Sequence, residues 1–101
     1  MFSGLVYNPI LYNSVDLIPE LFIDIVKDNI ELIDEPNPKK MFQTPMHNAA
    51  RKGCIESIKI LMTYNCQTID TYDLYHRTPL FNAAKKGHAN VIKILIELGS
   101  N

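Results

Sequence analysis

The chain has 101 residues, of which 47% are hydrophobic and 21% are charged, and its formal net charge at pH 7 is -1. This length limits it to one small domain with a modest core, and the composition excludes a disordered linker or a fibre. The longest apolar stretches are interrupted by carboxylates and are shorter than the roughly 18 apolar residues of a membrane span, which excludes a transmembrane segment.

The start of the chain and its cysteines indicate a cellular compartment. The N-terminal residues lack the basic flank and the cleavage site of a secretory signal. Cys54 and Cys66 are the only cysteines and do not have the spacing of a disulfide framework. We therefore expect an intracellular, cytoplasmic protein with two free thiols.

The charges are divided unevenly along the chain. Residues 1–36 contain seven acidic residues and one basic residue, a balance of -6, whereas residues 37–101 contain nine basic and four acidic residues, a balance of +5. This asymmetry predicts different neighbours for the two parts.

The N-terminal part contains few signals for secondary structure. Residues 1–15 predict no element beyond a turn at Asn8-Pro9. The stretch "LFIDIVKDNIELID", residues 21–34, has apolar residues at helical spacing. One interpretation is a single amphipathic helix with Asp16 near its N-terminus, and a second interpretation depends on the repeat that follows.

A repeat dominates the remainder of the chain. "TPMHNAARKG" at 44–53 recurs as "TPLFNAAKKG" at 78–87, and the longer windows 44–65 and 78–99 share eleven of 22 residues. The spacing of 34 residues lies in the range of stacked helical repeats, so we predict a solenoid.

The first segment of each repeat predicts a short helix. Thr44 can cap the helix start by accepting from its free N–H groups, and the proline after it stands at the first helical position, where no donor is needed. The small Ala49-Ala50 pair allows a neighbouring helix to approach closely. Gly53 can adopt the left-handed conformation that ends the helix.

A second, amphipathic helix follows each glycine. The apolar residues that share one face in the two copies are Ile58, Leu61 and Met62, and Ile92, Leu95 and Ile96. Asn65 and Gly99 can end these helices in the left-handed conformation. Residues 66–77 contain turn formers and no helical period, which predicts an extended hairpin loop.

This unit of helix, turn, helix and hairpin resembles the ankyrin repeat, whose signature is roughly "TPLHxAAxxGH" followed by paired aliphatic residues. The resemblance covers about 44–101. It departs from the family where Cys54 and Phe81 replace histidine and Asn65 replaces glycine, and the loop has one extra residue near Gln67 or Thr68.

The resemblance implies an all-α ankyrin-repeat solenoid of stacked helix-turn-helix units with hairpin loops. Residues 37–101 would hold two repeats, at about 44–77 and 78–101. Residues 1–36 would be an acidic segment with a degenerate capping repeat, in which Asp28-Asn29 stands in the place of "GH" and the second helix is cut short. The acidic surface of this segment suits the polar face that a terminal unit presents to water.

The chain contains histidines and cysteines, which can bind metals or act in catalysis, but not at the spacing that such sites need. The candidates His47, Cys54, Cys66, His76 and His88 lack paired ligand spacing, so we predict no metal and no cofactor. Nothing resembles an activated nucleophile or a phosphate loop, so we expect no catalytic residue, no enzymatic activity and no small-molecule substrate. The resemblance implies that His47 bonds to threonine and to loop backbone, and that His88 belongs to the turn.

Two sets of residues are candidates for partner binding. The basic pairs Lys39-Lys40, Arg51-Lys52 and Lys85-Lys86 recur in successive units, where they either complement helix dipoles or form a stripe that attracts an acidic partner. Large apolar residues fall at the predicted hairpin tips, where they either pack between hairpins or anchor a partner. The predicted partner-binding residues are Met41, Phe42, Arg51, Lys52, Tyr72, Leu74, Tyr75, Lys85 and Lys86.

By resemblance, we expect a protein–protein interaction module that binds another protein, with an acidic segment, through a concave face. One alternative is binding of nucleic acid or another polyanion by residues 37–101, although no recognition motif is present and arginines are few. Another is a structural fragment of a longer array. Residues 91–98 are apolar around much of the final helix, which predicts self-association through this helix.

Overall fold

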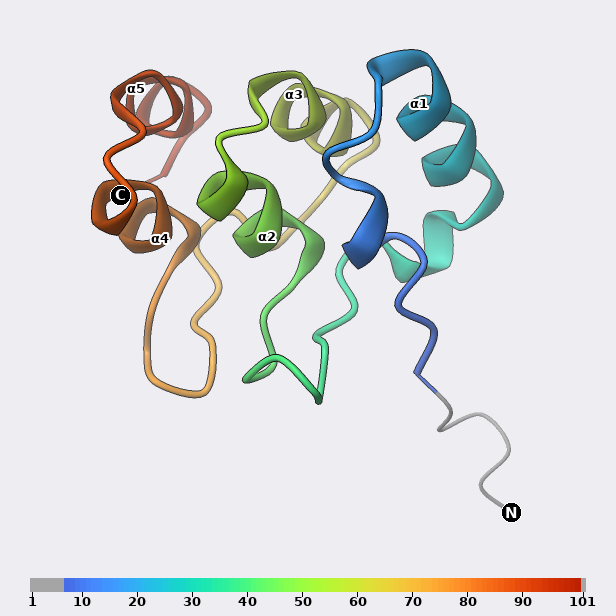
Figure 1. The fold of residues 1–101 in the computed structure, drawn as a ribbon, viewed down its shortest axis with the longest axis horizontal. Coiled ribbons are helices and arrows are strands. Elements are labelled where there is room, and N and C mark those ends of the chain that lie inside the picture. Colours follow the sequence, from blue (N-terminus) through green and yellow to red (C-terminus); the bar gives the residue numbers. More distant parts are fainter. Residues whose placement is uncertain (1–6, 101) are drawn as a thin grey trace.

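The computed structural model describes residues 7–100; residues 1–6 of the predicted acidic segment, and Asn101, lie outside the described residues. The described chain is helical and folds as a row of short elements joined by loops (Figure 1). The α-helices are α1 (Pro19–Asp28), α2 (Pro45–Lys52), α3 (Ile55–Thr63), α4 (Pro79–Lys85) and α5 (Ala89–Glu97), and the short 3₁₀ turns are η2 (Tyr12–Ser14) and η3 (Ile30–Leu32).

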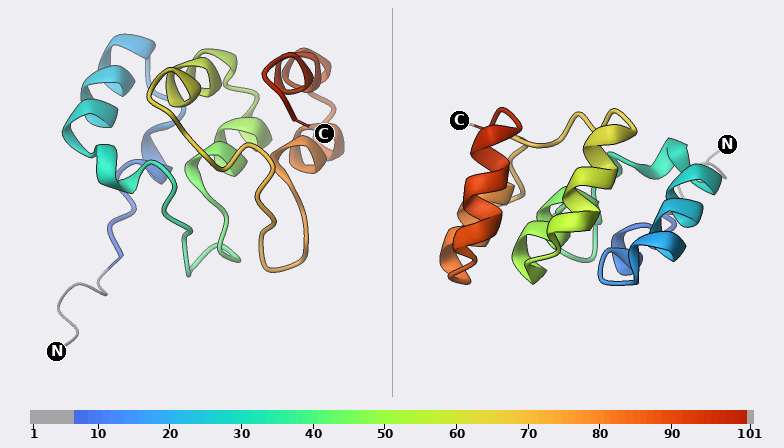
Figure 2. Two further views of the ribbon diagram at one scale, coloured as in Figure 1. Left: turned by 180° about the vertical axis from the view of Figure 1, so that it is seen from behind. Right: turned by 90° about the horizontal axis from the view of Figure 1, so that it is seen from above.

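The elements form two layers. Figure 1 shows η2, α2 and α4 in one layer and α1, α3 and α5 in the other, with the loops projecting beyond the first layer. Seen from above in Figure 2, the helices α1, α3 and α5 lie side by side. Contacts follow the stack, because α2 packs on α3, α4 and η2, while α3 packs on α1 and α5. The predicted all-α stack of helix-turn-helix units is confirmed.

The first helices begin and end as their sequence predicts. The hydroxyl of Thr44 accepts from the backbone N–H of His47 at 3.3 Å, and that of Thr78 accepts from Phe81 at 3.2 Å. Gly53 lies at φ +76° immediately after α2. At this φ a side chain other than glycine is strained, which explains the residue type.

The second helices end in the predicted left-handed residues. Asn65 follows α3 at φ +67°, and Gly99 follows α5 at φ +111°. Asparagine tolerates this conformation better than most side chains, so it can replace the glycine of the other unit.

The core lies between the two layers and runs along the stack. Ala49, Ala50 and Ala83 are buried where the first-layer helices meet. Ile58 and Leu95, from α3 and α5, are buried in the same cluster. Since each unit has one apolar side for each neighbour, burial requires that the units stack.

The predicted arrangement of the N-terminal unit is wrong in its register. Asp28-Asn29 lies between α1 and the single turn η3, but α1 packs on α3 as a second helix does, so this pair is not the junction between the first and the second helix. Phe22 and Val26, one turn apart, bury the face that fixes this packing. The first helix of this unit is η2, a single turn that contacts α2. The alternative of one amphipathic helix describes α1 itself, which begins at Pro19.

The loops before α2 and α4 are tied together. The first is closed by an antiparallel bridge between Asn37 and Gln43, and the second by a 2.9 Å bond from the N–H of Asp73 to the carbonyl of Arg77. Between them, the N–H of Leu74 donates to the carbonyl of Met41 at 2.8 Å. The two loop tips therefore hold each other in place.

Candidate functional site

His47 joins the start of α2 to the loop that precedes α4. Its ring Nδ1 accepts from the N–H of Thr44 at 3.2 Å, which places the ring proton on Nε2. Nε2 then donates to the carbonyl oxygen of Arg77 at 2.8 Å. The role that the family resemblance implies for His47 is confirmed: its ring fixes the loop at one edge of the first layer.

The surroundings of His47 favour the neutral ring. Burial lowers the pKa of His47 below its ordinary value of 6.5, and this effect outweighs the bond to Arg77 and the charge of Asp73, which both act to raise it. A neutral ring suits its position, because the hydrogen bond accepted at Nδ1 requires that this nitrogen carry no proton.

Asp73 organises the second loop. Its Oδ1 accepts from the N–H groups of Tyr75 and Arg77, and its Oδ2 accepts from Arg77 Nε at 2.8 Å and from Gln43 Nε2 at 3.1 Å. Burial alone would raise the pKa of Asp73, but these hydrogen bonds hold it below its ordinary value. Gln43 in turn accepts from the hydroxyl of Tyr12 at 3.4 Å. Hydrogen bonds between the side chains of Tyr12, Gln43 and Asp73 therefore connect all three units.

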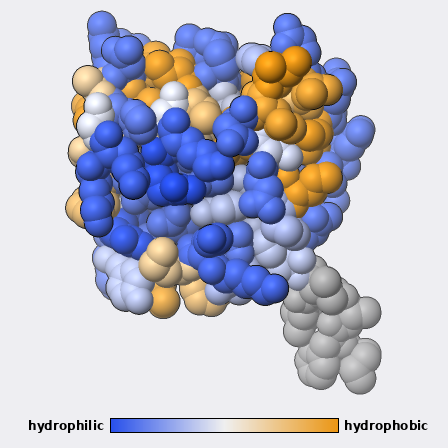
Figure 3. Space-filling view, viewed as in Figure 1, coloured by the Kyte–Doolittle hydropathy of each residue, from blue (hydrophilic) through white to orange (hydrophobic). Residues whose placement is uncertain are grey.

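A groove of about 300 Å³ lies between the first layer and the loops. We call it the basic groove, and it is lined by Tyr12, Lys40, Met41, Gln43, Arg51, Arg77, Asn82, Lys85 and Lys86. Five of these side chains are cationic. The surface over α2 and α4 is broadly hydrophilic, as Figure 3 shows.

The five cations of the basic groove differ in their partners. Arg77 is paired with the carboxylate of Asp73, and Arg51 donates to Asn48 Oδ1 at 2.5 Å. Lys40, Lys85 and Lys86 are exposed and take part in none of the ion pairs found within residues 7–100. These three ammonium groups are therefore available to an anionic ligand.

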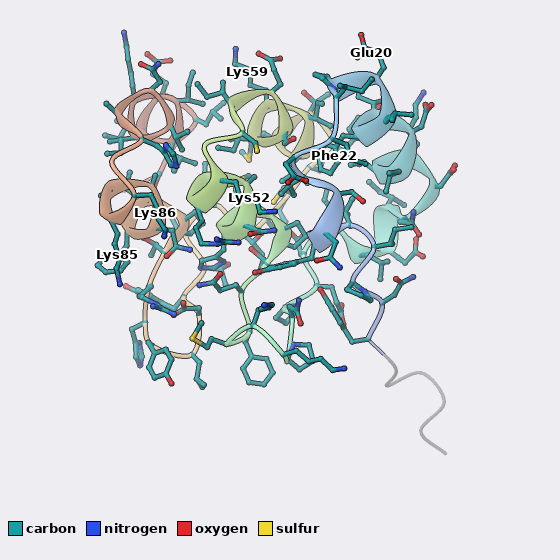
Figure 4. All side chains as sticks on the ribbon, in the orientation of Figure 1. Glu20, Phe22, Lys52, Lys59, Lys85 and Lys86 are labelled. Atoms are coloured by element: carbon teal, nitrogen blue, oxygen red, sulfur yellow. The ribbon has the colours of Figure 1, made fainter. Side chains whose placement is uncertain are left out.

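The structure brings together only some of the predicted partner-binding residues. Met41, Arg51, Lys85 and Lys86 line the basic groove. Lys52 does not line it, because its Nζ pairs with Asp16 Oδ2 at 3.1 Å and this ion pair lowers the pKa of Asp16. Figure 4 shows Lys52 on α2 and Lys85 and Lys86 at α4.

The remaining predicted residues lie at the loop tips. Phe42, Tyr72, Leu74 and Tyr75 are exposed there, and Figure 3 shows apolar atoms along this edge of the molecule. The guanidinium of Arg77 lies 5.1 Å from the centre of the Tyr75 ring, which connects the tip to the groove.

Sequence reasoning missed several residues of the basic groove. The sequence predicts Lys40 only as one of a basic pair, and Tyr12 lies in a region with no predicted element. Gln43 and Arg77 share a signal that could have identified them, because each stands directly before a Thr-Pro pair. That position faces the groove in both loops.

Within residues 7–100, no three His, Cys, Asp or Glu side chains lie close enough together to hold a metal ion. Cys54 and Cys66 are both free. None of the helices described between residues 7 and 100 is long and apolar enough to cross a membrane.

The fold and its recurring Thr-Pro caps define a stacked helical-repeat protein. A family model for ankyrin repeats, with three copies, matches residues 10–101. The chain therefore belongs to the ankyrin-repeat family, whose members are in general non-enzymatic protein–protein interaction modules. Among curated proteins, none matches the chain significantly.

Proposed function

We propose that this chain is a recognition module that binds an acidic segment of another protein along the basic groove. The observation that carries the proposal is the convergence of five cationic side chains on one groove, where Asp73 is the carboxylate that pairs with one of them. Such a concentration of positive charge attracts and orients a carboxylate-rich ligand.

The shape of the groove supports an extended peptide as the ligand. It is lined by residues of α2 and α4 and by residues of the two loops, whose tips are tied together by a backbone hydrogen bond. A site held in place before binding loses less conformational entropy when the ligand arrives.

The loop tips supply apolar contacts beside the charges. Met41 lies on the groove, and Leu74 and Tyr75 are exposed at the adjacent tip. Aromatic and aliphatic anchors contribute most of the energy of many interfaces, whereas rim charges mainly set the rate and orientation of association. We therefore expect the ligand to carry apolar residues among its carboxylates.

The test uses a fluorescent peptide that alternates glutamate with leucine and tyrosine, and fluorescence anisotropy as the measurement. The variant Lys85→Glu/Lys86→Glu should bind at least about tenfold more weakly, because like charges then face the ligand. Lys59→Glu, on α3 away from the loops (Figure 4), is the matched control and should bind as the unchanged protein does.

Two further probes separate the alternatives. A peptide with lysine in place of glutamate should not bind, and a single-stranded RNA should bind more weakly than the acidic peptide. Equal loss of affinity in the groove variant and in the Lys59 control would refute the proposed groove. Tighter binding of RNA, with a steep decrease as salt rises, would favour the polyanion alternative instead.

A further inference from the structure

The third unit, made of α4 and α5, exposes positions that the second unit, made of α2 and α3, buries. Residues 34 apart occupy equivalent places, so His47, which is fully buried, corresponds to Phe81, which is 46% exposed. Likewise Ala50 is buried and Ala84 is exposed. The second unit is covered by α4 and α5, so these differences mark the side of the third unit that a neighbour would cover.

The second helix of the third unit follows the same pattern. Lys59 and Met62 of α3 lie on the side that faces α5. Their equivalents Lys93 and Ile96 therefore lie on the side of α5 turned away from α3, and Ile96 is 55% exposed. We call Phe81, Ala84, Lys93 and Ile96 the C-terminal end face.

The opposite end of the stack exposes a second apolar side. Ile18 and Leu21 are 60% and 51% exposed. Leu21, the half-buried Ile25 and the exposed Asp28 share one side of α1 by their helical spacing, and Ile18 is the N-cap residue directly before this helix. We call these four residues the N-terminal end face. Pro19 lies on another side of α1, beside Ile55 of α3, so the N-terminal end face is turned away from the stack. Figure 3 shows an apolar area over α1.

The two end faces are complementary in charge as well as apolar. The N-terminal end face contains the exposed Asp28, and the same segment also exposes Glu20, Asp24 and Glu31. The C-terminal end face contains the exposed Lys93, and the same unit also exposes Lys85 and Lys86. Contact between unlike ends brings opposite charges together, whereas contact between like ends brings equal charges together and is disfavoured.

We propose that copies of this chain associate end to end, with the N-terminal end face of one copy packing on the C-terminal end face of the next. Burial of Ile18 and Leu21 against Phe81 and Ile96 supplies the apolar contact. Because the two faces differ, the contact is heterologous and continues the stack from copy to copy, which produces open chains rather than closed dimers. The apolar contact lies outside the basic groove, whereas Lys85 and Lys86 belong to both surfaces.

The test uses sedimentation velocity of the 101-residue chain over a wide range of concentration. Leu21→Lys blocks the N-terminal end face and Ile96→Glu blocks the C-terminal end face, in each case with a charge that repels the facing end. Both side chains are exposed, so the variants should fold, which circular dichroism verifies. Tyr72→Lys, at an exposed loop tip, is the matched control.

The unchanged chain and the Tyr72→Lys control should form species larger than dimers as concentration rises. Each blocked variant alone should stay monomeric. An equimolar mixture of the two blocked variants should form dimers and nothing larger, because it contains one intact face of each kind. A monomeric unchanged chain, a dimer of Leu21→Lys alone, or a mixture that stays monomeric would each overturn the proposal.

Discussion

The ring Nε2 of His47 lies 2.8 Å from the carbonyl oxygen of Arg77, thirty residues further along the chain. This bond crosses from the helix cap of one unit to the start of the next. Replacing His47 by alanine leaves the N–H of Thr44 and the carbonyl of Arg77 without this partner and opens a cavity. We expect a loss of about 2–4 kcal/mol in the free energy of unfolding.

Urea unfolding measures this loss. His76→Asn is the control, because His76 is an exposed loop residue at φ +60°, a conformation that asparagine tolerates, and its replacement should change the stability by less than about 0.5 kcal/mol. Similar losses in the two variants would show that the bond does not stabilise the stack.

Protonation of His47 should couple stability to pH. The folded-state pKa of His47 lies below 6.5, so between that pKa and about 6.5 the unfolded state binds more protons than the folded state. Stability is therefore complete above pH 6.5 and decreases as pH falls below it. In His47→Asn this decrease should become smaller, as urea midpoints on both sides of pH 6.5 would reveal. Asp73, whose pKa is lowered, contributes separately and only below about pH 4.

Two equivalent glycines should respond differently to alanine. Gly53 and Gly87 both lie at φ +76°, so each substitution costs about 1 kcal/mol of backbone strain. A Cβ at Gly53 would also lie 3.0 Å from the ring of His88, whose Nε2 bonds to the carbonyl of Arg51, whereas a Cβ at Gly87 meets nothing within 4 Å. Gly53→Ala should lose about 1 kcal/mol more than Gly87→Ala. Equal unfolding energies would mean that His88 moves aside freely.

Two adjacent alanines form another matched pair. Ala83 is fully buried at the contact between α4 and its neighbours, whereas Ala84 is exposed. Ala83→Leu should destabilise by about 1–3 kcal/mol through overpacking. Ala84→Leu should stay within about 0.5 kcal/mol, measured at low concentration. If both melt at the original temperature, α4 does not pack as described.

The two thiols should react slowly in the folded chain. Burial raises the pKa of Cys66 to about 11, and burial also raises that of half-buried Cys54. The thiolate is the reactive form, so native protein should consume a disulfide reagent slowly, Cys54 before Cys66. In the unfolded chain both thiols should react rapidly. Rapid reaction of Cys66 in native protein, or a bond between the two cysteines, would contradict their places at either end of α3.

The helix boundaries of the repeats could be predicted because their signals are local. A threonine cap, a proline and a left-handed glycine act within one helix, so Thr44 and Gly53 suffice to fix α2. The N-terminal unit has no such threonine cap, and α1 becomes a second helix only through its packing on α3. Its register could not be derived from the segment alone.

The basic groove could be predicted only in part. The sequence period places Arg51 and Lys85 in equivalent positions, so their convergence follows from stacking. The pairing of Lys52 with Asp16 does not, because it depends on how a non-repetitive turn meets α2. Tyr12 reaches the groove for the same reason. A repeat pattern cannot predict contacts between units whose sequences differ.

The bond between Leu74 and Met41 sets a limit on the breadth of recognition. With this bond and the one from Gln43 to Asp73 in place, neither loop tip can reorient without the other. The loops can then adjust to ligands of different shape only through their side-chain rotamers, because hydrogen bonds already fix their backbone. We expect such a surface to select ligands by shape and to tolerate variation in their sequence, so acidic segments that can adopt the extended conformation should compete for it, whereas acidic segments of equal charge held in another conformation should not.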